Sequence, residues 1–281
     1  MYQHTDHPVI AFIGGGNMAS AMVNGLVTHG YPPQSIIVAD PNEEQRAMAV
    51  KRFGVDISPT TPEAVEQAQV VVLAVKPQVV ERVAAQIAVM PSRGAKLFVS
   101  IAAGIRLSQL EKVLGFGTAI IRAMPNTPSL IGCGATAIFS NACTTEEQIS
   151  MVTRMMGSFG ICVTVSEESQ LDAVTAISGS GPAYFFLLME EMIRVGTQLG
   201  LSEQDALKLT LQTARGAANM AAQGEASPSQ LRARVTSPNG TTQCAINSMQ
   251  EDGLAMLIEH AVQAAHRRAV ELGMSSDPAR R

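Results

Sequence analysis

Short apolar runs alternate with amphipathic stretches over the first 165 residues of this 281-residue chain. Five runs rich in β-branched residues predict strands, at residues 9–13, 35–40, 70–75, 96–101 and 118–123. Strands that alternate with helices form a parallel sheet covered by helices on both faces. Because both faces are covered, such strands are apolar at nearly every position, as these are. The sequence therefore predicts an α/β fold here, with a doubly wound parallel sheet.

The strand pattern ends near residue 165, and helical periodicity replaces it. Apolar residues then recur at helical spacing, for example at Phe185, Leu188, Met189, Met192 and Ile193. Turn and cap signals divide this half into several helices. We therefore predict two domains, an α/β domain over residues 1–165 and an all-α domain over residues 166–281.

A helix predicted near residues 205–223 carries many small side chains, which let another backbone approach closely. These residues are Ala214, Gly216, Ala217, Ala218, Ala221 and Ala222. Tight packing within one subunit explains them, and so does a helical dimer interface, because symmetric homo-oligomers are common. The sequence leaves both alternatives open.

The composition favours a folded protein with a small ligand. Hydrophobic residues make up 46% of the chain and charged residues 16%, so a sizeable core is expected rather than disorder. The net charge is −4 without a block of like charges, which gives no sign of a nucleic-acid groove or a membrane-surface patch. We expect neither nucleic acid nor membrane as a partner.

The four cysteines and the N-terminal segment predict a cytoplasmic protein. Cys133, Cys143, Cys162 and Cys244 lie far apart without CxxC spacing, so we interpret them as reduced packing residues. The first residues lack the basic and apolar regions of a signal peptide. We expect no segment to span a bilayer, because none reaches the run of about 18 apolar residues that spanning needs.

Metal chemistry is not expected. The histidines show no metal-ligand spacing, and no HExxH motif is present. The predicted helical domain contains a single lysine, Lys208, without a partner nearby in the sequence. We therefore find no strong candidate for a cationic acid that would stabilise a developing alkoxide.

Residues 14–19 follow the first predicted strand and open a helix, and they form the GxGxxA version of the dinucleotide-binding fingerprint. Gly14 permits a tight turn, Gly16 lets the backbone approach a pyrophosphate, and small Ala19 lets the helix lie close to the sheet. The helix N-terminus offers N–H groups to the phosphates. The predicted contacts of this turn are Gly14, Gly16, Asn17, Met18 and Ala19. The alternative is a glycine turn without a ligand, which the strand–turn–helix context disfavours.

An acidic residue at the end of the second strand bears on the choice of cofactor. Asp40 stands where an acid typically binds the adenosine ribose hydroxyls and repels a 2′-phosphate, which argues for NADH. Arg46 lies one to two helical turns further on, within reach of such a phosphate. The predicted cofactor is therefore NADPH or NADH.

Later loops follow strands that end at the same edge of the predicted sheet, where doubly wound folds bind ligands. We predict cofactor contacts there at Ala74, Val75, Lys76, Pro77, Ile101, Ala102 and Ala103. Ordinary connecting loops are the alternative. In the proline-flanked loop 122–128, Asn126 is placed to orient the nicotinamide carboxamide, with a simple Asx turn as an equal alternative.

The segment 235–242 concentrates hydroxyl groups and backbone N–H groups at the start of a helix predicted to begin near Thr241. Such a terminus suits a carboxylate. A plain capping turn explains the same residues, and from spacing alone it is the somewhat better explanation.

Six motifs in order give the chain its resemblance to a known family: GGGNMA, AVKP, SIAAG, MPNTP, SGSGPAYFF and VTSPNGTT. Together they resemble the pyrroline-5-carboxylate reductases along nearly the full length. The resemblance implies hydride transfer from NADPH or NADH to (S)-1-pyrroline-5-carboxylate, giving L-proline. It also implies a Rossmann domain, a helical domain that forms a homodimer, and often a ring of five dimers.

The resemblance also implies roles for particular residues. The carboxylate of the substrate would bind at Ser237, Gly240, Thr241 and Thr242, with Thr242 near the ring nitrogen as the catalytic residue. Glu168 matches a position that contacts ligand in relatives. Asn239 replaces the glycine of the commoner SPGGTT loop, and asparagine tolerates the positive φ of that turn.

These inferences yield one hypothesis and its rivals. The hypothesis is that the iminium binds between the two domains and receives a hydride from the nicotinamide, mainly through positioning. Another imine reductase or a β-hydroxyacid dehydrogenase on the same plan is the enzymatic alternative, although Lys208 lies too far beyond the SGSG turn to serve as the latter's lysine. A non-catalytic NAD(P)-sensing protein is the alternative from another class.

Overall fold

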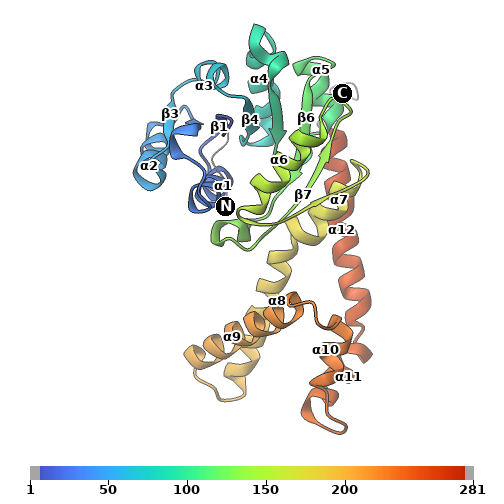
Figure 1. Cartoon of the computed structure of the whole chain (residues 1–281). Coiled ribbons are helices and arrows are strands. Elements are labelled where there is room, and N and C mark those ends of the chain that lie inside the picture. The colour runs from blue at the N-terminus through green and yellow to red at the C-terminus, as the bar shows by residue number, and fades with distance from the viewer. Residues whose placement is uncertain (1–6, 276–281) are drawn as a thin grey trace. The chain divides into compact units, whose positions relative to one another are not determined.

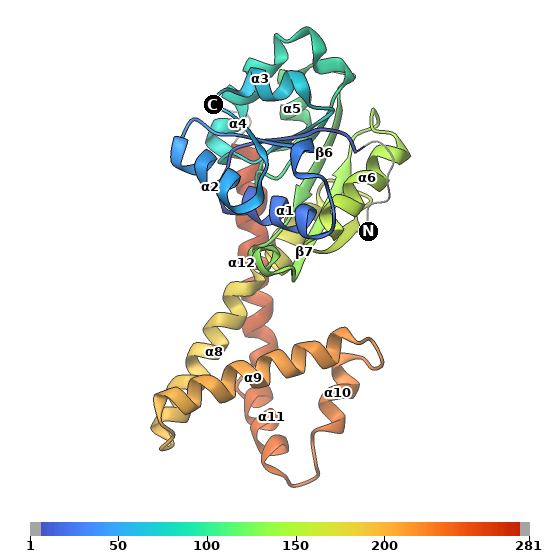
Figure 2. The same ribbon diagram turned by 60° about the vertical axis from the view of Figure 1, so that its left-hand side comes forward.

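The computed structural model describes residues 7–275, which divide into two compact units. The first contains the chain up to Ser180 together with the chain from Ala265 onward, and the second is Gly181–Ala264. The predicted boundary at residue 165 separates a dinucleotide-binding part from a substrate-binding and dimerisation part. A division by compactness does not test it, so that boundary stays a prediction. Each unit is described by itself below (Figures 1 and 2).

The first unit is built on an eight-stranded sheet in the order β3-β2-β1-β4-β5-β6-β7-β8 (Figure 1). The strands are β1 (Ile10–Ile13), β2 (Ile36–Ala39), β3 (Asp56–Ser58), β4 (Val70–Leu73), β5 (Leu97–Ser100), β6 (Ala119–Met124), β7 (Gly134–Ser140) and β8 (Gly160–Thr164). All five predicted strands are present and parallel to their neighbours in the β2-β1-β4-β5-β6 series. The predicted doubly wound sheet is therefore confirmed, and its order reverses between β1 and β4.

The far edge of the sheet departs from a purely parallel arrangement. β7 pairs antiparallel with β6, and β8 pairs parallel with β7. Neither strand was predicted, and β3 was also missed. A Cβ added at Gly160 would lie 2.0 Å from the carbonyl oxygen of Gly134, so only glycine lets β7 and β8 approach at this point.

Helices lie between the strands in the first unit. They are α1 (Asn17–Thr28), α2 (Glu43–Phe53), α3 (Thr61–Gln67), α4 (Pro77–Ala88), α5 (Leu107–Leu114), α6 (Glu146–Gly157) and α7 (Gln170–Val174). Short irregular helices are η1 (Pro33–Ser35), η2 (Pro91–Ala95), η3 (Thr127–Ile131) and the π-helix η4 (Thr175–Gly179). They cover both faces of the sheet: in β1, Ile10 and Phe12 enter one buried cluster while Ala11 and Ile13 enter the other.

The second unit consists of helices, as predicted. These are α8 (Gly181–Gln198), α9 (Glu203–Ala222), α10 (Pro228–Arg234), α11 (Thr241–Glu251) and the first part of α12 (Leu254–Ser275). Within residues 181–264 only Gly181, Ala206 and Thr210 are buried. A Cβ at Gly196 would lie 3.3 Å from the Cβ of Ala206, which shows how closely α8 and α9 pack.

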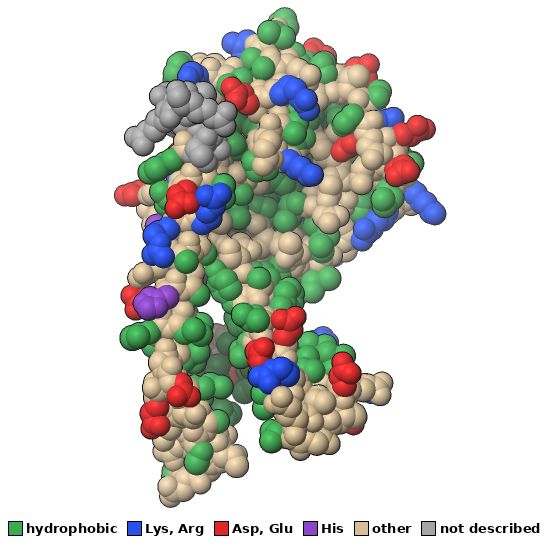
Figure 3. All heavy atoms as spheres, turned by 180° about the vertical axis from the view of Figure 1, so that it is seen from behind, with side chains coloured by type: hydrophobic (Ala, Val, Ile, Leu, Met, Phe, Trp, Pro, Cys, Tyr) green, Lys and Arg blue, Asp and Glu red, His purple; other side chains and the backbone are tan. Residues whose placement is uncertain are grey.

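Large apolar side chains lie on the surface of these helices, where the space-filling view shows many hydrophobic groups (Figure 3). Phe185 is 64% exposed, Leu188 51% and Leu257 65%. The small residues Ala217, Ala218, Ala221 and Ala222 of α9 are exposed as well. Packing against the described residues of the same chain therefore does not explain them.

One helical run, Gln170–Gln198, contains an 18-residue window with a mean hydropathy of 1.2, which membrane-spanning helices also reach by length and composition alone. Polar residues interrupt this run, so it holds no continuous stretch of 18 apolar residues. An exposed apolar helix of this kind also suits contact with another protein chain.

Candidate functional site

The glycine turn after β1 is shaped by close approach to the loop after β4. Gly14 has φ +106°, and its N–H donates to the carbonyl oxygen of Ala39 at 2.7 Å. A Cβ at Gly14 would lie 2.8 Å from the carbonyl oxygen of Ala74. Both the φ angle and the contact require glycine. The structure thus brings together Gly14 and Ala74, two of the residues predicted to contact the cofactor.

The start of α1 offers open space beside backbone N–H groups. Gly16 is the N-cap, and no side chain of the described residues caps this helix. A Cβ at Gly16 would meet nothing within 4 Å. Gly16 and Asn17 are exposed, Met18 is half-buried and Ala19 is 2% exposed. The small Ala19 lets α1 lie against the sheet, and the terminus fits a pyrophosphate.

Asp40 lies directly against this turn. Its Oδ2 accepts a hydrogen bond from the N–H of Gly15 at 2.8 Å, and its Oδ1 accepts from the N–H of Asn42 at 2.8 Å. The Arg46 guanidinium donates from Nη1 to the carbonyl oxygen of Asp40 at 2.7 Å. The acid that suits ribose hydroxyls and the cation that suits a 2′-phosphate therefore lie at the same strand end.

The other predicted cofactor loops follow β4 and β5, which are hydrogen-bonded neighbours of each other. Lys76 is exposed at the N-cap of α4, while Ala74, Val75 and Pro77 are half-buried. After β5, Ile101 donates its N–H to the carbonyl oxygen of Leu73 at 3.2 Å. Ala102 is buried and Ala103 is exposed. These loops share the carboxyl edge of the sheet with the glycine turn.

Asn126 is almost fully buried, and both ends of its side-chain amide already have protein partners. Nδ2 donates to the carbonyl oxygen of Ser178 at 2.9 Å, and Oδ1 accepts from the N–H of Ala135 at 2.8 Å. The predicted contact with the nicotinamide carboxamide stays a prediction. These two bonds instead give Asn126 a role inside the protein.

Glu168, predicted to contact ligand, belongs to a cluster of four charged side chains. Its Oε1 accepts from the N–H of Leu107 at 2.7 Å and from Nη1 of Arg122 at 2.5 Å. Beside it, Arg106 donates to Asp172 at 2.6 Å. Burial lowers the pKa of the Arg122 guanidinium, and the Glu168 carboxylate opposes that shift. This carboxylate also sits at the N-terminus of α5, where negative charge is favourable.

The sequence did not predict the roles of Arg106, Arg122 and Asp172. One signal was available: Arg122 interrupts the otherwise apolar strand run at 118–123. A charged residue at a buried strand position requires a partner of opposite charge. The sequence alone does not identify that partner, which here comes from 46 residues further along the chain.

The predicted anion turn lies in the second unit and precedes α11. Asn239 has φ +58°, so the expectation that asparagine adopts a positive φ here is confirmed. The N–H of Gly240 donates to the carbonyl oxygen of Ser237 at 3.0 Å. The helix begins at Thr241, as predicted, and Thr242 is half-buried. No side chain in the described chain caps it, so the hydroxyls of this turn do not serve as a plain helix cap.

Helix starts in this protein differ in whether a side chain caps them. Four have a capping side chain that accepts from a first-turn N–H, namely α2, α6, α9 and α10. Those of α1, α3, α4, α7 and α11 lack a capping side chain among residues 7–275. Three of these, α1, α4 and α11, are starts for which the sequence predicted a ligand. Uncapped N–H groups at these places are available to anionic groups.

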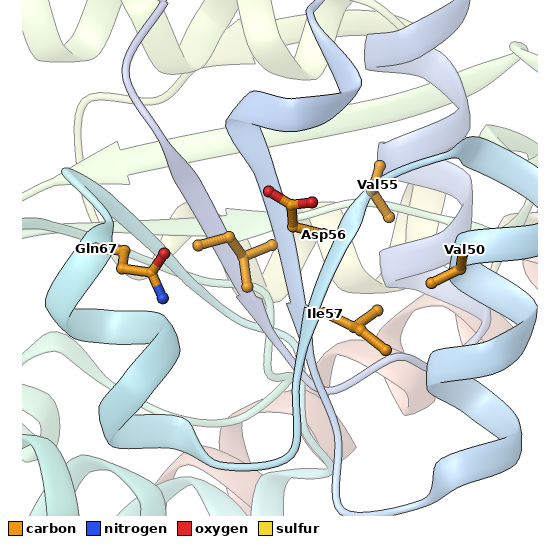
Figure 4. Close-up of a pocket in the computed structure, with 6 residues that line it drawn as sticks. Val50, Val55, Asp56, Ile57 and Gln67 are labelled. Atoms are coloured by element: carbon orange, nitrogen blue, oxygen red, sulfur yellow. The ribbon is translucent and has the colours of Figure 1, made fainter.

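The surface has a hollow whose lining contains none of the residues predicted to bind cofactor or substrate. This hollow of about 380 Å³ is lined by Ile37, Val50, Val55, Asp56, Ile57 and Gln67 (Figure 4). It lies near the amino ends of β2 and β3, away from the glycine turn. Among the residues that the structure describes, no group of three or more His, Cys, Asp or Glu side chains is arranged to hold a metal ion.

Comparisons with known proteins cover nearly the whole chain. The family described as pyrroline-5-carboxylate reductase dimerisation matches residues 168–272, and the family described as NADP oxidoreductase coenzyme F420-dependent matches residues 9–104. A pyrroline-5-carboxylate reductase of Pseudomonas aeruginosa is 48% identical over 266 residues, which are 94% of this chain and 97% of that protein.

Two solved structures share this fold. A pyrroline-5-carboxylate reductase from Coxiella burnetii is 40% identical, with a TM-score of 0.91 over 95% of this chain and 99% of that one. A Plasmodium falciparum pyrroline carboxylate reductase with NADP bound is 29% identical, with a TM-score of 0.84 over 95% of this chain and 98% of that one.

Proposed function

This chain belongs to the pyrroline-5-carboxylate reductase family, and we propose on that premise that it reduces (S)-1-pyrroline-5-carboxylate to L-proline. It is an NAD(P)-dependent oxidoreductase acting on a cyclic imine. The observation that carries the proposal is that one chain contains both a glycine turn suited to a dinucleotide and an uncapped helix start suited to a carboxylate. The expected fold, family and cofactor class agree with the comparisons.

The residues of the first unit fit a dinucleotide. The positive φ of Gly14 and the open space at Gly16 leave room for phosphates beside the N–H groups of α1. Asp40 and Arg46 would meet the adenosine ribose. The loops Ala74–Pro77 and Ile101–Ala103 would flank the rest of the cofactor. When bound, the reduced nicotinamide supplies the hydride.

The turn in the second unit would hold the substrate. The N–H groups of Thr241 and Thr242 and the hydroxyl of Ser237 would bind its carboxylate, and Gly240, whose N–H donates to the Ser237 carbonyl oxygen, would line the same turn. The Thr242 hydroxyl would lie near the ring nitrogen. A hydride joins the imine carbon, the C=N π electrons move to nitrogen, and the cationic iminium becomes a neutral amine. No anion develops, so the reaction needs no cationic acid, and positioning supplies most of the catalysis.

The chain forms homo-oligomers, since a dimerisation family matches residues 168–272. We propose that the dimer is formed by the helical domain, residues 166–281, and that dimers assemble further into a decamer. The exposed apolar side chains of α8 and α12 support such an interface. We also propose a cytoplasmic location, with neither nucleic acid nor membrane as a partner.

One assay tests the reaction and the cofactor choice together. NADPH and NADH absorbance are followed in parallel with pyrroline-5-carboxylate and with a β-hydroxyacid plus oxidised cofactor. Oxidation of reduced cofactor only with the imine, and formation of proline, is expected. Cofactor binding without turnover would instead indicate a sensing protein, and turnover of the β-hydroxyacid alone would indicate a dehydrogenase.

A further inference from the structure

Pro182 is the second residue of α8 (Gly181–Gln198). Because proline has no backbone N–H, a hydrogen-bond donor is missing at the start of this helix. Ser178 lies in the π-helix η4, and α8 begins three residues later at Gly181. An α-helical continuation through this junction would pair the carbonyl oxygen of Ser178 with the N–H four residues on. That residue is Pro182, which has no N–H. The side chain of Asn126 donates from Nδ2 to this same carbonyl oxygen at 2.9 Å. Asn126 therefore provides a donor where the helix has none at the i+4 position.

The same side chain is fixed at its other end. Its Oδ1 accepts from the N–H of Ala135 at 2.8 Å, at the beginning of β7. Asn126 is 8% exposed, so water competes weakly for either bond. One amide thus connects the loop after β6 to β7 and to the π-helix η4.

A packing contact reinforces this connection. A Cβ at Gly179 would lie 2.8 Å from the Cε of Met124, so the end of β6 presses against the helix at the residue that follows Ser178. The backbone here is already irregular, since the N–H of Ser180 donates to the carbonyl oxygen of Thr175 at 2.8 Å, a π-helical bond. Such irregular turns occur often at functional sites.

We propose that Asn126 is a positioning residue, which supplies the N–H that Pro182 lacks and thereby fixes the loop 124–128. That loop follows β6 and ends at the carboxyl edge of the sheet, beside the loops assigned above to the cofactor. In this role Asn126 acts through the Ser178 carbonyl and needs no direct contact with the nicotinamide. The effect on catalysis rests on the proposed function, whereas the effect on stability does not.

A double-mutant cycle tests this role. Asn126→Ala removes both side-chain hydrogen bonds, the one to Ser178 and the one from Ala135, and should lower kcat/KM by roughly tenfold or more and lower Tm. Pro182→Ala restores a backbone N–H at the α-helical i+4 position of Ser178. In the Pro182→Ala background, Asn126→Ala should therefore cost mainly the share of kcat/KM and Tm that belongs to the Ala135 bond, and this smaller loss is the non-additivity expected for coupled residues.

Matched variants keep the outcome clear. Pro228→Ala, at the start of α10, should not rescue Asn126→Ala. Asn126→Asp retains an acceptor for Ala135 but lacks the amide donor, and it serves if Asn126→Ala does not fold. Equal losses in the wild-type and the Pro182→Ala backgrounds would overturn the proposal, as would a loss confined to the KM for cofactor. The Tm measurements decide the question even if the wild-type protein reduces no imine.

Discussion

The two compact units of this protein use their apolar residues in opposite ways. In the first unit, strands such as β1, β4 and β5 are buried at every position, and both faces of the sheet are covered. In the second unit, residues as large as Phe185 and Leu257 are more than half exposed. Burial of apolar surface drives folding and association alike. The core of the first unit is therefore formed within one chain, whereas the exposed apolar surface of the second unit suits contact with another chain.

This difference also separates the two candidate ligand sites. The glycine turn is held by contacts within one sheet, through Gly14, Ala74 and Asp40. The turn before α11 lies on helices whose exposed apolar surface we propose to be covered by another chain. We expect cofactor binding to depend on the chain's own core, and substrate binding to depend more strongly on oligomerisation.

The largest effect should come from charging the exposed apolar surface of α8. Phe185→Glu together with Leu188→Glu would place two carboxylates in the proposed dimer interface, where burial of an unpaired charge costs several kcal/mol. The oligomer should dissociate, as measured by analytical ultracentrifugation. Phe116→Glu is the matched control, because Phe116 is 86% exposed but lies in the first unit. An intact oligomer in the α8 variant would contradict the inference that the exposed apolar residues of the second unit form the dimer interface.

The next effect should arise inside the first unit, at its charged cluster. Glu168→Gln leaves the Arg122 guanidinium, whose side chain is 7% exposed, without its carboxylate. The expected loss is about 3 kcal/mol in the free energy of unfolding. Glu191→Gln breaks an exposed pair with Arg194 and should cost about 0.5 kcal/mol or less. Urea denaturation at one protein concentration measures the free energy of unfolding of both variants. Equal losses would contradict the expectation that the buried ion pair contributes more than the exposed one.

Thr242→Val tests the turn of the second unit. Loss of the hydroxyl near the ring nitrogen should lower kcat by roughly ten- to hundredfold, the cost of a hydrogen bond to a charged group. The Kd for NADPH, measured by fluorescence, should stay unchanged. Thr213→Val, an exposed residue of α9, is the control for a general effect of the substitution. An unchanged kcat would remove Thr242 from the catalytic residues.

Gly16→Ala tests the glycine turn without disturbing the fold. Its added Cβ meets nothing within 4 Å in the protein, but it projects into the space proposed for the pyrophosphate. The Kd for NADPH should rise about tenfold or more while Tm stays constant, because a methyl group there displaces the phosphates. Gly94→Ala, which also has free space, should change neither quantity. Unaltered NADPH binding in Gly16→Ala would place the phosphates elsewhere.

A last prediction changes no residue and concerns the Cys162 thiol of β8, which packs against the core of the first unit. Burial raises the pKa of Cys162 to about 11, so less thiolate is present near pH 8 than for a free cysteine. Alkylation of Cys162 should be roughly a hundredfold slower than that of the exposed Cys133 and Cys143. Mass spectrometry of the labelled protein measures the rates. Comparable rates would mean that this edge of the sheet opens readily.

Much of the first unit could be predicted because local patterns determine it. The β-branched runs and the GxGxxA turn each specify one element, and β1, β2, β4, β5 and β6 follow from them. β3 was missed because it is three residues long. β8 is a mostly exposed edge strand, and its short apolar run, Ile161, Cys162 and Val163, was a local signal that the strand prediction did not use. The reversed direction of β7 depends on pairing with β6, which no local pattern encodes.

The candidate sites divide in the same way. The turns at 14–19 and 237–242 are continuous in sequence, so their geometry could be anticipated, including the positive φ of Asn239. The partners of Asn126 and Arg122 come from residues 178 and 168, far along the chain. Their roles depend on tertiary contacts, which a single sequence does not reveal.

A crystal structure with oxidised cofactor and L-proline bound tests the central claim most directly. We expect the pyrophosphate at the start of α1 and the carboxylate of proline about 3 Å from the N–H groups of Thr241 or Thr242. A carboxylate bound away from residues 237–242 would contradict the assignment of this turn, even if the dinucleotide occupied the glycine turn as expected.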